Sequence, residues 1–95
     1  MRQTIWKYEM AVEDWVRIVI PDGARFLKIG EQDRKLCLWV LVDLEKSPRA
    51  YYFRIFGTGQ DIPECIGEYI GTAQIGSYVW HVFEETAKED QRGSL

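Results

Sequence analysis

Short blocks in which apolar and polar residues alternate run along most of this chain, and they constrain its fold more than any other feature. Successive side chains of a β-strand point to opposite faces, so a period of two predicts strands with one buried face. In Arg25–Glu31, for example, Leu27 and Ile29 are predicted to face inward and Lys28 outward. Gly, Pro and Asp residues separate the blocks, as turns require. Seven blocks carry the pattern: Thr4–Met10, Trp15–Ile20, Arg25–Glu31, Leu36–Val42, Arg49–Phe56, Glu68–Ile75 and Tyr78–Phe83.

Seven predicted strands at short spacing in 95 residues indicate an all-β fold, with antiparallel strands in a small sandwich or barrel. At most one short helical turn is expected, at Asp61–Ile66, where Asp61 can cap the turn and Pro63 lies early in it. Residues 1–83 are therefore expected to form a single β domain. Residues 84–95 contain no aromatic side chain and half of them are charged, which predicts a disordered, flexible tail.

The block Leu36–Val42 differs from the others because both of its faces are apolar. It is either a central strand that is covered on both sides or one half of a subunit interface. The second interpretation predicts a homo-oligomer. Its candidate interface residues are Leu36, Leu38, Trp39, Val40 and Leu41.

Composition and charge narrow the classes of partner. The chain has no run of about 18 apolar residues and no apolar signal segment after Met1, so we expect a cytoplasmic protein that does not bind membranes. Of the net charge of −3, residues 84–95 contribute −2, from four acids and two bases. The near-neutral remainder disfavours long duplex nucleic acid and leaves a small anionic ligand or a protein as partner. One histidine and two cysteines, without metal-ligand spacing, predict no metal site, and no other cofactor is expected.

A repeated Gly-Thr-x-Gln pattern, at Gly57–Gln60 and Gly71–Gln74, suggests a ligand site. Its structural interpretation is that the glycines mark bulges or close approach of the backbone. Its functional interpretation is a polar lip that binds an anionic or nucleotide-type ligand through hydroxyl, amide and backbone N–H groups. Tyr52 and Arg54 share one face of a predicted strand and are expected to form an exposed aromatic–basic pair, which either packs across strands or could stack a base or anchor a partner. The candidate ligand-binding residues are Tyr52, Arg54, Thr58, Gln60, Thr72, Gln74 and His81.

Catalysis has little support in the sequence. His81 is the only histidine, and Gln74, seven positions earlier across a turn, is the residue that could oppose it in a hairpin. No nucleophile-elbow pattern surrounds Ser47 or Ser77. We therefore expect no catalytic residue and a protein that is not an enzyme.

Five segments together resemble a family of short, uncharacterised phage and prophage proteins. They are Thr4–Tyr8, Cys37–Asp43, Ile55–Gly59, Gly67–Gln74 and Val79–Glu84, so the resemblance covers nearly all of the chain before the predicted tail. It implies a small accessory protein in the cytoplasm of an infected bacterium. No catalytic residue is carried over from the family.

These observations lead to one main functional hypothesis and two alternatives. The first is a phage-encoded, non-enzymatic counter-defence protein that sequesters a small nucleotide-type signal in an oligomeric pocket. The second is a protein–protein inhibitor of a host defence complex. The third is a structural protein of a virion or tail.

Overall fold

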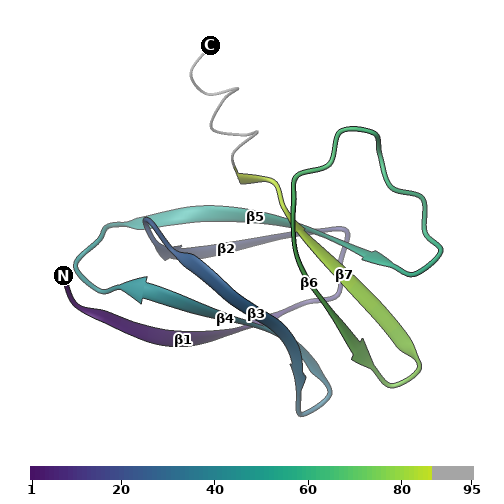
Figure 1. The fold of residues 1–95 in the computed structure, drawn as a ribbon, viewed down its shortest axis with the longest axis horizontal. Coiled ribbons are helices and arrows are strands. Elements are labelled where there is room, and N and C mark those ends of the chain that lie inside the picture. Colours follow the sequence, from purple (N-terminus) through teal and green to yellow (C-terminus); the bar gives the residue numbers. More distant parts are fainter. Residues whose placement is uncertain (87–95) are drawn as a thin grey trace.

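The computed structural model describes residues 1–86, which form two antiparallel sheets packed face to face (Figure 1). The predicted all-β class with seven strands is confirmed, and every predicted strand end lies within one residue of the observed one. The sheet orders are β1-β4-β3 and β2-β5-β7-β6. The strands are β1 (Gln3–Met10), β2 (Trp15–Pro21), β3 (Arg25–Gln32), β4 (Lys35–Asp43), β5 (Pro48–Gly57), β6 (Glu68–Ile75) and β7 (Tyr78–Glu84).

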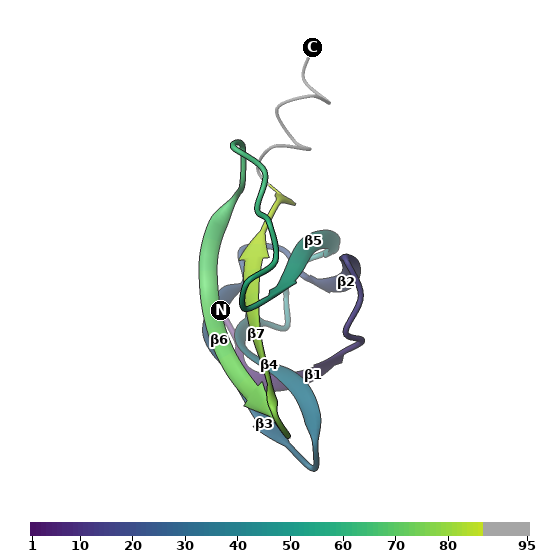
Figure 2. The same ribbon diagram turned by 90° about the vertical axis from the view of Figure 1, so that its right-hand side faces the viewer.

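The two sheets touch along one side, where β3 of the first sheet runs beside β6 of the second (Figure 2). Gly71 on β6 makes this approach feasible, because a Cβ atom there would lie only 2.8 Å from the Cβ of Ile29. Within residues 1–86, no helix is long and apolar enough to cross a membrane.

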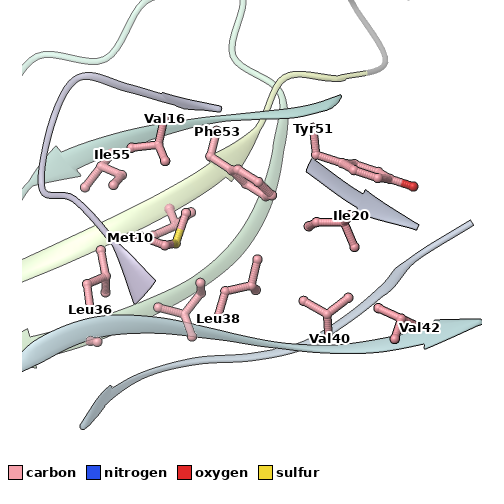
Figure 3. Packing of buried hydrophobic residues seen from close by; sticks show 13 residues of the cluster. Met10, Val16, Ile20, Leu36, Leu38, Val40, Val42, Tyr51, Phe53 and Ile55 are labelled. Atoms are coloured by element: carbon pink, nitrogen blue, oxygen red, sulfur yellow. The ribbon is translucent and has the colours of Figure 1, made fainter. Parts of the chain in front are cut away.

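The core lies between the sheets and is built from the side chains that point inward from the strands (Figure 3). Phe53 and Ile20 of the four-stranded sheet and Val40 of the three-stranded sheet are fully buried. Phe26 closes one side of the core, with edge-to-face contacts to Tyr51 and Phe53 at centroid distances of 5.5 and 5.4 Å. Such aromatic pairs stabilise a core beyond the area that they bury.

Strand β4 is a central strand, paired with β1 on one side and β3 on the other. Its inward residues Leu36, Leu38 and Val40 are at most 1% exposed, so the core of one chain already covers them. They leave no surface for a subunit interface, which corrects the prediction at these three positions. Trp39 and Leu41 are half-buried on the outer face and are the two predicted interface residues still accessible there.

Leu27 does not face inward as predicted, since 43% of it is exposed. A bulge between Phe26 and Lys28 shifts the phase of β3, so that Phe26 lies opposite Val40 and takes the inward position. A bulge of this kind adds one residue to one strand only, and the alternation changes phase there.

The predicted helical turn at residues 61–66 does not form. Ile62 in this segment is 46% exposed, so no apolar face is buried that would offset the cost of nucleating a helix.

The predicted boundary between domain and tail, at residue 84, falls inside the folded part. Glu84 ends β7, and Glu85 and Thr86 are buried. The hydroxyl of Thr86 accepts a hydrogen bond from the backbone N–H of Tyr52 at 2.8 Å. The rest of the predicted tail, residues 87–95, lies outside the described residues.

Candidate functional site

The outer face of the four-stranded sheet collects most of the predicted ligand-binding residues. Strand register places Trp15, Arg54, Phe83 and Tyr69 opposite one another in a single row across β2, β5, β7 and β6. The neighbours of these residues along the strands, such as Val82, point into the core, so the row points away from it.

Arg54 lies at the centre of this face between two aromatic rings. Its guanidinium carbon is 4.6 Å from the ring centroid of Trp15 and 5.0 Å from that of Phe56. Its Nε atom is buried and has no hydrogen-bond partner, and Arg54 forms no ion pair with any residue that the structure describes. Cation–π contacts therefore hold the guanidinium in place, and no carboxylate of residues 1–86 pairs with it.

His81 lies in the next row, bonded on both sides by threonine. Its Nε2 atom is 2.8 Å from the hydroxyl oxygen of Thr58, and its Nδ1 atom is 2.9 Å from that of Thr72. The hydroxyl of Tyr69 lies 2.5 Å from the same oxygen of Thr72. A neutral imidazole has one donor and one acceptor nitrogen, and a hydroxyl can serve either, so this chain of bonds fixes the ring orientation.

Phe56 connects the two rows of this face. It pairs with His81 in the strand register, and its ring contacts both the guanidinium of Arg54 and, edge to face at 5.9 Å, the ring of Phe83. The cationic group and the hydroxyl–imidazole chain are thus neighbours on one surface.

A family model described as a domain of unknown function, DUF7352, matches residues 1–93. The chain belongs to the DUF7352 family. This confirms that it is a member of an uncharacterised family, and the matched range includes most of the segment after β7. No curated protein and no solved structure matches the chain.

The Gly-Thr-x-Gln repeat of this DUF7352 domain brings its two threonines, and not its glutamines, together. The side-chain oxygen of Gln60 accepts a hydrogen bond from the N–H of Gly57 at 2.9 Å, and the amide of Gln74 donates to the carbonyl of Gly76 at 3.1 Å. Each glutamine thus stabilises its own turn. In the β6–β7 hairpin Gln74 pairs with Val79, so the expected opposition to His81 is wrong and Thr72 takes that place.

The two glycines that begin the repeats have packing roles. A Cβ at Gly57 would lie 3.3 Å from the ring of Trp80, and the one at Gly71 would meet Ile29. This agrees with the structural interpretation, in which glycine permits close approach.

Tyr52 lies farther along β5, opposite Arg17, and the expected contact between Tyr52 and Arg54 is not among those the structure shows. The rings that do contact Arg54 were not among the predicted site residues. The sequence signal for these rings was the alternation of side chains along the strand. Trp15 and Phe56 are next to the inward-facing residues Val16 and Ile55, so they had to point to the outer face.

Proposed function

We propose that this DUF7352 domain is a non-enzymatic binding protein for a small anion that carries a planar ring, a nucleotide-type ligand. The observation that carries the proposal is the guanidinium of Arg54, which is held between Trp15 and Phe56 and has no carboxylate partner in the part of the chain that the structure describes. An arginine in fixed orientation without an acidic partner favours a phosphate, which it can bind with two parallel hydrogen bonds.

The surroundings of Arg54 suit the rest of such a ligand. Trp15 and Tyr69, at the two ends of the row, are 53% and 55% exposed, which leaves ring surface on which a base can stack. The hydroxyl–imidazole chain of Thr58, His81 and Thr72 adds donors and acceptors for a sugar or a second phosphate oxygen.

The wider setting belongs to the same proposal. The resemblance to short phage proteins supports a role in an infected bacterial cytoplasm, where sequestering a nucleotide-type signal would blunt a defence response. One sheet face is shallow, and a homo-oligomer would supply a second wall to the pocket. Neither the inhibitor nor the virion hypothesis calls for an arginine without an acidic partner, so ligand binding is preferred.

Calorimetric titration with AMP, cyclic AMP, cyclic di-AMP and inorganic phosphate tests the proposal. We expect saturable binding of at least one of the ring-bearing phosphates, and the bound nucleotide should be recovered chemically intact. Arg54→Met should weaken that binding about 10- to 100-fold, because a charge-assisted hydrogen bond contributes about 1.5–3 kcal/mol.

The matched control is Lys7→Met, which removes an exposed cation from β1 of the other sheet and should leave the affinity unchanged. Absence of binding to all four probes, an Arg54→Met affinity equal to that of the parent, or conversion of the nucleotide would each refute the proposal.

A further inference from the structure

A cleft lies where the end of β1, the β3–β4 turn and the ends of β6 and β7 nearest their turn meet. Figure 1 shows the β3–β4 and β6–β7 turns at the same end of the molecule. The cleft has a volume of about 440 Å³, within the range of about 300–1,000 Å³ typical of small-molecule sites. Its floor is apolar, since Met10 and Leu36 are 4% and 1% exposed, and Ile75 and Trp80 form part of its wall.

The mouth of this cleft is charged. Glu9, Arg34 and Lys35 line it, and Lys35 Nζ forms an ion pair with a Glu9 carboxylate oxygen at 3.4 Å. The side chain of Arg34 has no hydrogen bond or ion pair with the residues described by the structure. The pairing of Lys35 with Glu9 leaves Arg34 as the cation available to a ligand.

Arg34 also occupies an unusual backbone conformation. Asp33 and Arg34 have φ angles of 53° and 64°, so both residues of this tight turn are left-handed. Glycine is strongly preferred at the second such position, because a Cβ atom there is strained. A strained residue at the mouth of a cleft suggests that its side chain is kept for a function.

We propose that this cleft binds an amphipathic carboxylate, whose apolar body lies on the floor beside Met10, Leu36 and Trp80 and whose carboxylate pairs with Arg34. An apolar floor below a cationic mouth matches this class of ligand in both polarity and charge. The site is separate from the outer sheet face. Trp80 and His81 are consecutive residues of β7, so their side chains point to opposite faces of the sheet, and Trp80 packs against the core.

Decanoate, used below its micelle-forming concentration, is the probe, and 1-decanol is its uncharged counterpart. Calorimetry should show saturable binding of decanoate and binding of decanol that is at least ten-fold weaker. Arg34→Gly should weaken decanoate binding at least ten-fold without lowering the melting temperature, because glycine relieves the left-handed strain. A merely structural arginine would not separate affinity from stability in this way.

Two further variants keep the test specific. Arg34→Asn keeps a residue that tolerates the left-handed region and removes the charge, so it should lose affinity as Arg34→Gly does. Arg54→Met should bind decanoate as the parent does, which separates this site from the proposed nucleotide site. The inference is overturned if decanoate does not bind, if decanol binds as tightly, if either Arg34 variant keeps full affinity, or if Arg54→Met abolishes decanoate binding.

Discussion

Replacing Gly71 with alanine would test how the two sheets are held together along β3 and β6. The new Cβ would lie 2.8 Å from the Cβ of Ile29, 3.0 Å from its Cγ1 and 3.4 Å from its backbone nitrogen. Carbon atoms attract most at about 3.5–4.0 Å, so the two strands would have to separate by about 1 Å. The obstructing atoms are a Cβ and a backbone nitrogen, which cannot rotate away as the end of a long side chain can.

The expected cost follows from two opposing effects. Overpacking of a core contact costs about 1–3 kcal/mol, whereas the reduced freedom of the unfolded chain on changing glycine to alanine returns about 0.4–1 kcal/mol. Gly71→Ala should therefore lower the free energy of unfolding by about 1–2 kcal/mol. For a domain of this size that corresponds to a fall of about 4–16 °C in melting temperature.

Urea unfolding followed by tryptophan fluorescence, in a double-mutant cycle with Ile29, measures whether this contact is the cause. Ile29→Ala removes Cγ1 but keeps the Cβ at 2.8 Å, so Gly71→Ala should remain costly in that background. Ile29→Gly removes both atoms and should absorb most of the cost. Gly23→Ala is the control, because that glycine has a φ of 75° and no atom within 4 Å of its Cβ position. Its cost should be the same with Ile29 or Gly at position 29, since the two sites do not touch.

Two results would show that the reasoning is wrong. One is a Gly71→Ala variant as stable as the parent. The other is an equal cost of Gly71→Ala with and without the Ile29 side chain, which would place the strain somewhere other than the contact between β3 and β6.

Two other contacts give separate predictions. Thr86→Val keeps the side-chain shape but leaves the Tyr52 N–H without its acceptor. Urea denaturation should therefore show that the free energy of unfolding falls by about 1–3 kcal/mol. An unchanged free energy of unfolding would mean that the hydrogen bond is not formed in solution. Hydrogen bonds from the N–H groups of Glu45 and Arg2 lower the pKa of Asp43 in the folded state, so its stabilisation is present above about pH 4 and is lost as the pH falls through the folded pKa. Asp43→Asn can accept the same bonds without a charge, so the stability difference between parent and variant should shrink from pH 5 to about pH 2 in urea titrations, and a constant difference would contradict the assignment.

The strands were predictable because their signal is local. Alternation within each block and a turn residue after it are properties of a few consecutive residues, and the hairpins at Asp33-Arg34 and Gly76-Ser77 join blocks that are adjacent in sequence. The inward direction of Leu27 was not predictable in this way, because the bulge in β3 is defined only by its pairing with β4.

The division into two sheets also lies beyond a local pattern. β1 pairs with β4 and β2 with β5, and each of these pairings joins segments separated by other strands. Every block has the same alternation, so the pattern does not determine which strands become partners. The two apolar faces of Leu36–Val42 left its place open for this reason.

The contacts within the candidate site also depend on strand pairing, which the local pattern does not determine. Thr58, Thr72 and His81 were identified as candidate ligand-binding residues, yet their mutual contacts depend on β5 and β6 both pairing with β7. The Gly-Thr-x-Gln repeat marked the two threonines that bond His81, and its glycines have the role that the structural interpretation gave them. Its glycines make room for Trp80 and Ile29.

Strand register explains why no carboxylate among residues 1–86 pairs with Arg54, and no single segment of the sequence reveals that register. Its cross-strand partners are Trp15 and Phe83, and an acidic residue is adjacent to each of them in sequence, Asp14 and Glu84. A slip of one residue in either pairing would place a carboxylate opposite Arg54, but it would also turn every inward side chain of that strand outward. Burial of the inward residues therefore fixes the register that keeps both carboxylates away from the guanidinium. The packing that stabilises the core thus also keeps the Asp14 and Glu84 carboxylates from facing this cation.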